Sequence, residues 1–311
     1  MKSVCLAILN FNGVHHLEFL LPTLAQAMAG ADAKTNVVVL DNRSTANDIA
    51  WLAAHAPGIE VVVAPQNDYL YSYNDLLASR TEDIVVLLNN DLRLAPGFLQ
   101  ALLRPFDEPD IFSVGATSRD WDDTAYTCGP ATLHAHHGVY SWDWQRDRQT
   151  ASNTLFTSGG FMAVDRKRFL ELGGFNRLFY PGYGEDLDLC FRAWRRGWRC
   201  VFEPAALVYH RENGTFSTRA QRLMERSQWL FQWSSLPASA SWLERAAMTA
   251  LTAVRRASAG DTGWLIRRMQ IRQEWQSLRH HHSHLMTAPD ELHAICQRMQ
   301  SAVTPAKAPL A

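Results

Sequence analysis

The first 105 residues alternate short aliphatic runs with amphipathic segments, and this alternation limits the fold more than any other feature of the chain. The runs cover residues 4–9, 37–40, 59–63 and 84–88. Runs that are apolar at nearly every position suit strands buried on both faces. Because helices between such strands are the connections that a parallel sheet requires, the alternation predicts an α/β fold with helices on both faces of the sheet.

Helical patterns lie between these runs, near residues 17–28, 49–53, 69–79 and 96–103. Pro22 falls inside the first pattern and predicts a kink or a late start, because proline lacks the backbone donor of a helix interior. Ser44 and Thr45 are candidate caps of the second helix. Beyond Pro105, residues 117–153 indicate loops or irregular strands, and residues 155–164 indicate a strand.

Polar residues follow three of the predicted strands at the point where each strand ends. Asn10-Phe11-Asn12-Gly13 follows the first, Asp41 the second, and Asn89-Asn90-Asp91 the fourth. Ligands of open α/β sheets bind outside the carboxyl ends of the strands, where an aspartate can accept hydrogen bonds from a nucleoside or hold a hard cation. Each of these residues taken alone is more often an ordinary turn or helix-cap residue, and it is their occurrence at neighbouring strand ends that makes a binding site an equal alternative. The first turn is not G-x-G-x-x-G, which argues against a dinucleotide oxidoreductase.

A second group of polar residues begins a predicted helix. The apolar residues Leu187, Cys190, Phe191 and Trp194 recur at the spacing of one helical face, and Gly197 ends the pattern. Glu185 and Asp186 then lie at the helix N-terminus, where the helix dipole favours an ionised carboxylate, the form that a general base needs. The alternative is ordinary acidic capping, and Asp188 is interpreted as structural.

Two further segments fit a binding site. Ser158-Gly159-Gly160 interrupts an apolar stretch, and glycines at such a place allow a ligand or another backbone segment to come close. His210 ends the strand-like run Val208-Tyr209-His210. A single histidine is more often structural, but His210 and Asp91 together would suit a divalent cation.

Six segments in this order resemble an inverting family 2 glycosyltransferase: N-x-N-G after the first strand, then V-V-L-D-N-x-S-T, L-L-N-N-D, S-G-G-F-M-A-V, G-E-D-L-D-L-C-F-R and V-Y-H. The resemblance covers residues 3 to about 216. It implies the GT-A fold, in which a mostly parallel, Rossmann-like nucleotide-binding sheet is continuous with an acceptor-binding half.

The resemblance also implies roles for individual residues. On the donor side, Asp41 would contact the nucleobase and Asn10 and Asn12 the nucleoside, with Asn67, Asn89 and Asn90 also contacting the donor. Asp91 and His210 would hold Mg2+ or Mn2+. Asp186, paired with Glu185, would be the general base, and Ser158, Gly159 and Gly160 would border the acceptor. Residues 66–74 depart from the Gly-rich segment of many relatives, and Tyr69, Tyr71 and Tyr73 are expected to narrow the donor pocket.

The implied reaction is inverting transfer of a sugar from a nucleotide-diphosphate sugar to a hydroxyl of a saccharide or lipid-linked saccharide. A sugar nucleotidyltransferase is the alternative enzyme, but the turn from Asn10 to Gly13 lacks the basic residues that a triphosphate would require. A catalytically inactive glycan- or nucleotide-binding module would lack a base or a metal ligand, whereas Asp91, Asp186 and His210 are all present.

The formal net charge of −1 divides unevenly along the chain. Residues 1–210 carry 17 basic and 24 acidic residues, whereas residues 211–311 carry 13 and 7. We therefore divide the chain into a glycosyltransferase domain, 1–216, with a nucleotide-sugar half (1–105) and an acceptor half (106–216), and a basic helical C-terminal extension, 217–311. The acidic catalytic part and the lack of a recognisable module argue against nucleic acid as a partner.

The extension contains two apolar stripes at helical spacing. The first consists of Leu243, Ala247, Leu251 and Val254, and the second of Trp264, Ile271, Trp275 and Leu278. Packing on the catalytic domain is the favoured interpretation; a peripheral contact with an anionic membrane and a homodimer interface are the alternatives.

The N-terminus does not have the pattern of a signal peptide, since the apolar run 4–9 leads directly into a turn. No stretch reaches the roughly 18 apolar residues of a membrane-spanning helix. The expected location is the cytoplasm, or the inner face of the membrane if the extension binds lipid.

Overall fold

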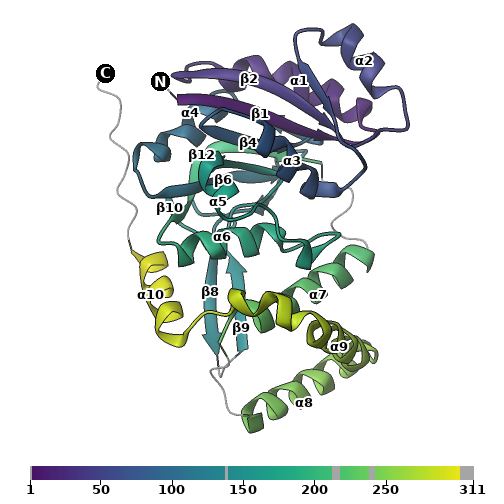
Figure 1. Cartoon of the computed structure of the whole chain (residues 1–311), viewed down its shortest axis with the longest axis vertical. Coiled ribbons are helices and arrows are strands. Elements are labelled where there is room, and N and C mark those ends of the chain that lie inside the picture. The colour runs from purple at the N-terminus through teal and green to yellow at the C-terminus, as the bar shows by residue number, and fades with distance from the viewer. Residues whose placement is uncertain (1, 137–138, 212–217, 238–241, 302–311) are drawn as a thin grey trace.

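The computed structural model of the chain describes residues 2–136, 139–211, 218–237 and 242–301 (Figure 1). Its centre is a ten-stranded sheet whose main path runs β10-β12-β6-β11-β4-β1-β2-β3. Strands β1, β2, β3 and β4 are mutually parallel, and β11 is antiparallel to both β4 and β6. The strands of the main path are β1 (Lys2–Asn10), β2 (Ala33–Asp41), β3 (Glu60–Val63), β4 (Ile84–Asn89), β6 (Ile111–Asp120), β10 (Ser152–Asn153), β11 (Phe161–Asp165) and β12 (Arg199–His210).

Two short strands extend this sheet, and a separate hairpin stands apart from it. β5 (Leu92–Leu94) pairs with β12, and β7 (Tyr126–Cys128) pairs with β6. The hairpin consists of β8 (Ala131–His136) and β9 (Val139–Trp144). The helices are α1 (Val14–Met28), α2 (Asp48–His55), α3 (Ser72–Ser79), α4 (Phe98–Leu103), α5 (Arg166–Glu171), α6 (Glu185–Arg195), α7 (Thr218–Ser235), α8 (Trp242–Ser258), α9 (Trp264–His282) and α10 (Pro289–Gln300).

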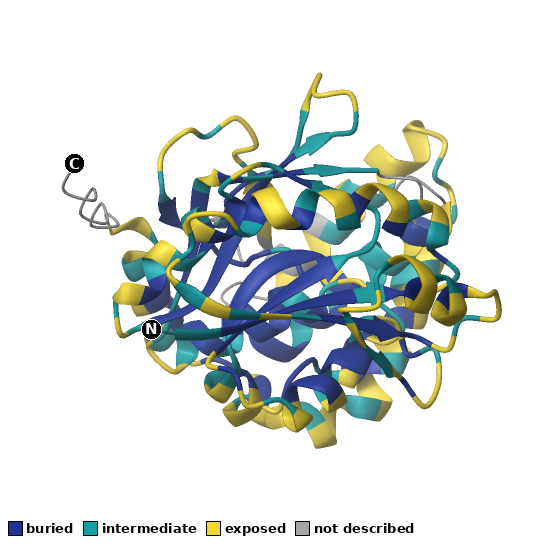
Figure 2. Cartoon of the chain, turned by 90° about the horizontal axis from the view of Figure 1, so that it is seen from above, coloured by how far each residue is buried: buried dark blue, intermediate teal, exposed yellow. Residues whose placement is uncertain are grey.

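Both faces of the sheet are covered, as the all-apolar strands predict. Along β1, Val4, Leu6 and Ile8 enter one hydrophobic cluster, while Cys5 and Ala7 enter the other. Helices α1 and α4 cover the first face, and α3, α5 and α6 cover the second. Figure 2 shows the buried strands between helices that are exposed on their outer sides. The predicted α/β architecture and its first four strands are confirmed.

Local details differ from the sequence-based expectations. Helix α1 begins at Val14 and includes Pro22, so a late start is wrong. Neither Ser44 nor Thr45 caps α2, whose N-cap is Asn47, because the two side chains bond to the turn after β1 instead. The strand expected over 155–164 begins only at Phe161. Residues 117–153 contain a regular hairpin, β8–β9, where loops or irregular strands were expected.

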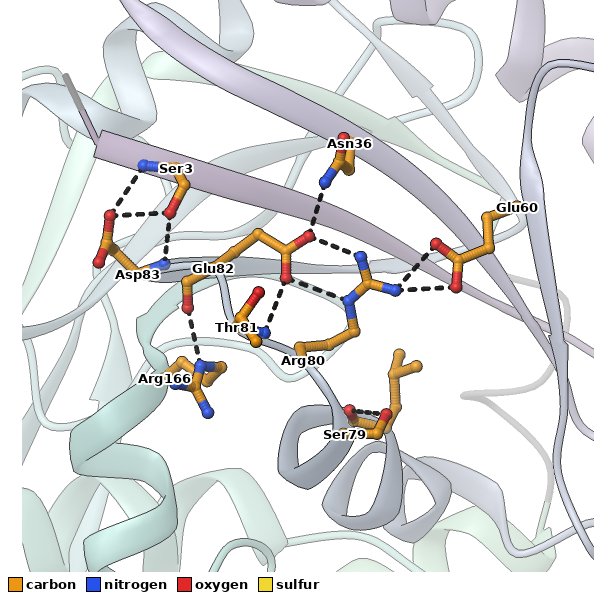
Figure 3. Close-up of polar contacts among 10 residues, drawn as sticks. Ser3, Asn36, Glu60, Ser79, Arg80, Thr81, Glu82, Asp83 and Arg166 are labelled. Atoms are coloured by element: carbon orange, nitrogen blue, oxygen red, sulfur yellow. Dashed lines mark hydrogen bonds and ion pairs between the residues drawn. The ribbon is translucent and has the colours of Figure 1, made fainter.

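An ion-pair network fastens the amino-terminal edge of the sheet, opposite the predicted site (Figure 3). Arg80 donates to both carboxylate oxygens of Glu60 at 2.9 Å and to Glu82 Oε1 at 2.6 Å. Glu82 also accepts from Asn36 of β2 at 2.8 Å. The hydrogen bond from Arg80 is the main reason that the pKa of the buried Glu82 is lowered to about 2. The network therefore joins β2, β3 and the start of β4 through charged groups that remain ionised.

The C-terminal helices are built into the body of the protein. Leu230 and Phe231 of α7, Ile271 and Trp275 of α9, and Ile295 of α10 belong to the same hydrophobic cluster as the second face of the sheet. Packing of the second apolar stripe is thus confirmed, since Trp264, Ile271 and Trp275 are buried and Leu278 is partly buried. The predicted boundary at 216/217 lies in residues 212–217, outside the described residues. Of the helices described, none combines the length and the hydropathy needed to cross a bilayer.

Truncation of Trp275 should destabilise the protein far more than truncation of Ile266 on the same helix. Trp275 is 6% exposed and Ile266 62% exposed. We expect Trp275→Ala to lower the free energy of unfolding by about 3–5 kcal/mol and Ile266→Ala by no more than about 0.5 kcal/mol. Urea unfolding followed by circular dichroism measures both. Equal losses would show that α9 does not pack on the body as described.

Candidate active site

The side-chain amide of Asn10 joins the carboxyl ends of three strands. Asn10 is fully buried at the end of β1. Its Nδ2 donates to Asp48 Oδ1 at 2.8 Å and to Asp41 Oδ1 at 3.2 Å, while its Oδ1 accepts from Asn90 Nδ2 at 2.8 Å. Since Asp41 ends β2 and Asn90 follows β4, the predicted donor-side residues lie in direct contact at one edge of the sheet.

The turn after β1 is held against the loop after β2. Asn12 Oδ1 accepts from the backbone N–H groups of Thr45 at 2.8 Å and Ala46 at 3.0 Å. Asp41 is fully buried, and its Oδ2 accepts from the backbone N–H of Ser44 at 2.9 Å. Asn12 and Asp41 therefore shape the loop between β2 and α2, and the expected contact of Asp41 with a nucleobase stays a prediction.

Asp91 and His210 are far apart in the sequence but lie next to each other in the structure. His210 Nε2 lies 3.2 Å from Asp91 Oδ1, because β5, directly after Asp91, pairs with the end of β12. Asp91 Oδ1 is buried and accepts no hydrogen bond from the described residues. A carboxylate oxygen beside an imidazole nitrogen fits a divalent cation. No third metal-binding side chain of the described residues joins this pair, so the other ligands would have to come from substrate or water.

Gly159 and Gly160 connect Asp186 with Asn89. The Gly159 N–H donates to Asp186 Oδ2 at 3.1 Å, and the Asn89 N–H donates to the Gly160 carbonyl at 2.7 Å. A Cβ atom on Gly160 would lie 2.6 Å from Asn89 Nδ2, so a side chain here would force that of Asn89 to move. Ser158 is partly exposed beside them. The predicted acceptor-side glycines thus lie between the predicted base and the Asn89-Asn90-Asp91 segment.

Glu185 and Asp186 are neighbours in sequence but occupy different environments. Glu185 is buried, and its Oε2 has no hydrogen-bond partner among the described residues. Burial, reinforced by the charge of Asp186, raises the pKa of Glu185 to about 8. Burial also raises the pKa of Asp186, but N–H groups of Gly159 and Leu187 donate to its carboxylate and oppose this shift. At neutral pH Glu185 is therefore largely protonated, and Asp186, which is partly exposed and accepts from two N–H groups, is the better placed of the two to act as a base.

The aromatic segment 66–74 differs from its predicted role. Tyr71 and Tyr73 are buried in the core, where the Tyr73 hydroxyl donates to the carbonyls of Ala7 and Leu88 at 3.0 Å. These two side chains do not line a pocket, so only Tyr69, 44% exposed, can narrow one. Tyr69 has a φ of 53°, a region that favours glycine. Asn67 lies in the turn just before it and accepts from the Tyr69 N–H at 3.3 Å.

Two residues of the site were not found by sequence reasoning. Asp48 accepts from both the Asn10 side chain and the Gly13 N–H, at 2.8 and 2.6 Å. Its position in the first turn of α2 is the signal that could have found it. His16 begins α1, and its buried Nδ1 has no hydrogen-bond partner in the described part of the chain. Burial lowers the pKa of His16, and the nearby charge of Asp91 opposes that change.

The fold matches that of solved glycosyltransferases. A mannosyltransferase from Pyrobaculum calidifontis, solved with GDP-Man and Mn2+, superposes with a TM-score of 0.56 at 15% identity, covering 86% of each chain. GalNAc-T7, solved with UDP, GalNAc and Mn2+, superposes with a TM-score of 0.53 at 13% identity, covering 73% of this chain and 47% of that one. The architecture is the GT-A fold of glycosyltransferases.

The sequence narrows this class further. Residues 5–231 match the family model described as glycosyltransferase-like family 2, and the chain belongs to that family. A relative from Mycobacterium tuberculosis, N-acetylglucosaminyl-diphospho-decaprenol L-rhamnosyltransferase, is 26% identical over 63% of this chain and 71% of its own length. Polypeptide N-acetylgalactosaminyltransferase 3 of Drosophila melanogaster is 30% identical over 41% of this chain, which spans 22% of that enzyme.

The raised pKa of Glu185 predicts a pH-dependent effect on stability. An unfolded Glu185 would titrate near 4.5 and the folded one near 8. Its contribution to stability is therefore complete below about pH 4.5 and is lost as the pH rises through about 8. Glu185→Gln removes this ionisation, so the variant should gain in unfolding midpoint relative to wild type between pH 5 and pH 9.

Differential scanning calorimetry at both pH values measures this gain. Glu171→Gln, at an exposed position in α5, is the control and should show no such trend. The same midpoint difference between Glu185→Gln and wild type at pH 5 and pH 9 would contradict a proton bound to Glu185 at neutral pH.

Proposed function

We propose that this chain transfers a sugar from a nucleotide-diphosphate sugar to a hydroxyl of a saccharide or lipid-linked saccharide, with inversion at the anomeric carbon. The observation that carries the proposal is the placement of Asp186. Its carboxylate accepts a hydrogen bond from the Gly159 N–H at the same sheet edge as the Asp91–His210 pair. A base and a cation site at one edge are the minimum requirement for displacing a diphosphate with a hydroxyl group.

The donor is expected to bind at the ends of β1, β2 and β4. The Asn10–Asp41–Asp48 contacts fix the loops that would surround a nucleoside, and Asn89 and Asn90 continue this surface toward Asp91. Asp91 and His210 would hold Mg2+ or Mn2+, which when bound stabilises the negative charge that develops on a leaving diphosphate. The Mn2+ in both similar structures supports this choice of cofactor.

The reaction then requires Asp186 in its unprotonated, carboxylate form. Its carboxylate accepts the proton of the acceptor hydroxyl as the oxygen attacks the anomeric carbon from the face opposite the diphosphate. The bond from carbon to the new oxygen forms as the bond to the diphosphate breaks, so one displacement inverts the centre. Glu185, kept protonated by burial, adds no negative charge directly beside Asp186 at the N-terminus of α6.

The name of the mycobacterial relative supports a lipid-linked saccharide as acceptor. Ser158, Gly159 and Gly160 would border this acceptor. Residues 1–216 would form the catalytic domain and residues 217–311 the extension. A cytoplasmic location, at the inner face of the membrane, suits such an acceptor and stays a prediction.

Asp186→Asn should reduce kcat for sugar transfer by roughly 10²–10⁴-fold, because general-base assistance contributes that much. Nucleotide affinity should stay nearly unchanged, since Asp186 does not contact the Asn10–Asp41–Asp48 group. Transfer assays across UDP-, GDP- and dTDP-sugars and calorimetric titration with the nucleotides measure the two quantities. Asp107→Asn, an exposed surface change, is the control. A variant that keeps wild-type turnover would place the base elsewhere.

Asp91→Asn should lower the affinity for Mn2+ at least ten-fold in the presence of UDP or GDP. The substitution replaces a carboxylate oxygen of the Asp91–His210 pair with a neutral amide. Electron paramagnetic resonance of free Mn2+ measures binding without any turnover. Asp122→Asn, on an exposed loop, should bind Mn2+ like wild type. Unaltered Mn2+ binding by Asp91→Asn, or full transfer activity in EDTA, would refute the metal assignment.

A further inference from the structure

Helix α8 turns its apolar face away from the protein. Leu243, Leu251 and Val254 recur at the spacing of one helical face and are 61%, 48% and 66% exposed. Ala247 and Ala250 on the same face are also exposed. The favoured packing of this first stripe on the catalytic domain is therefore wrong, because the helix lies in the opposite orientation.

The described side chains that α8 turns inward are small or polar. Among the α8 side chains that the structure describes, the partly buried ones are Thr249, Thr252 and Ala253. These positions are three and four residues apart and form one face. A helix on the surface of a globular protein normally buries its apolar stripe and exposes its polar residues. Among its described side chains α8 shows the reverse arrangement, and its outward apolar residues have no partner within the described chain.

Helix α9 also carries exposed apolar residues near α8. It contacts α8 and follows it after a turn of residues 259–263. In its first two turns Leu265, Ile266 and Met269 are exposed, although the opposite side of α9 packs on the body. We refer to Leu243, Leu251, Val254, Leu265, Ile266 and Met269 as the α8–α9 apolar surface. α8 forms the lower end of the molecule in Figure 1.

Positive charge lies beside this surface. Arg255 and Arg256 directly follow Val254, and both are exposed. No ion pair joins either of them to a carboxylate of the described residues, whereas Asp261 in the adjoining turn and Glu225 are both paired with Arg267. Residues 211–311 carry 13 basic and 7 acidic residues, so this part of the chain is cationic as a whole.

We propose that the α8–α9 apolar surface binds an anionic lipid bilayer, with α8 lying in the plane of the interface. Apolar side chains flanked by arginines on a helix that is too polar to span the membrane are the properties of an interfacial helix. Arg255 and Arg256 would then contact lipid phosphates, each contributing to an attraction that weakens with salt.

A second copy of the chain fits this surface less well. Helix α8 has 17 residues and is therefore roughly 25 Å long. The α8 part of the surface, a stripe of that length and about 10 Å in width, covers roughly 250 Å². That is about a third of the approximately 800 Å² per partner of a stable protein interface, and only three residues of α9 add to it. A bilayer does not require a matching surface of fixed size and supplies the negative charge that the arginines lack.

This inference goes beyond the proposed function and is tested without turnover. The full chain is floated on a density gradient with vesicles of phosphatidylcholine containing 30% phosphatidylglycerol, and separately with pure phosphatidylcholine. We expect flotation with the anionic vesicles alone, and its loss in high salt. Leu251→Gln/Val254→Gln should weaken binding at least ten-fold, and Arg255→Gln/Arg256→Gln should weaken it similarly.

Controls carry the same changes on the body of the protein. Leu170→Gln is the control for the apolar change, and Lys167→Gln/Arg196→Gln is the control for the loss of two charges; all three positions are exposed. Control proteins should float like wild type, and all variants should keep the wild-type unfolding midpoint and donor hydrolysis. Wild-type protein that does not float, or α8 variants that float normally, would overturn the proposal. A wild-type dimer in light scattering that Leu251→Gln/Val254→Gln dissociates would also overturn it in favour of a second copy.

Discussion

The side-chain amide of Asn10 is the contact on which this active-site edge depends. It is buried, and it uses both its amino group and its carbonyl to bind groups from the ends of β2 and β4 and the start of α2. A buried polar group left without partners costs about 1–3 kcal/mol, so these loops have one arrangement that satisfies them together. Loops that would otherwise vary independently are thereby fixed relative to one another. Asp91, which contacts His210, directly follows Asn90 in the sequence.

Residues that follow from periodicity and topology could be predicted from the sequence. The apolar runs marked the strands β1 to β4, although β3 is not buried on both faces and exposes Val63. Strand ends in a parallel sheet meet at one edge, so Asn10, Asp41 and Asn90 come into contact as expected. The apolar face of α6 likewise placed Asp186 at a helix N-terminus. What these residues bind is not contained in the periodicity and rests on family resemblance.

Contacts set by residues distant in the chain could not be predicted in this way. Ser44 has the chemistry of a helix cap, but its hydroxyl donates to Asp41 and accepts from the Asn12 N–H. Tyr73 was expected in the donor pocket, but its hydroxyl donates to the carbonyls of Ala7 and Leu88 in the core. These partners are distant in the chain and cannot be recognised from the sequence around Tyr73. The apolar stripe of α8 has the period of a buried helix face, but the period alone does not determine whether that face packs on the protein or is exposed.

The backbone of Gly159 and Gly160 sets the distance between two parts of the candidate site. The Gly159 N–H donates to the Asp186 carboxylate, and the Gly160 carbonyl accepts from the Asn89 N–H. The separation between the Gly159 N–H and the Gly160 carbonyl is thus set by the covalent main chain, and only the carboxylate of Asp186 reaches it through a side chain. The surrounding side chains can therefore differ between related proteins while this main-chain distance stays the same.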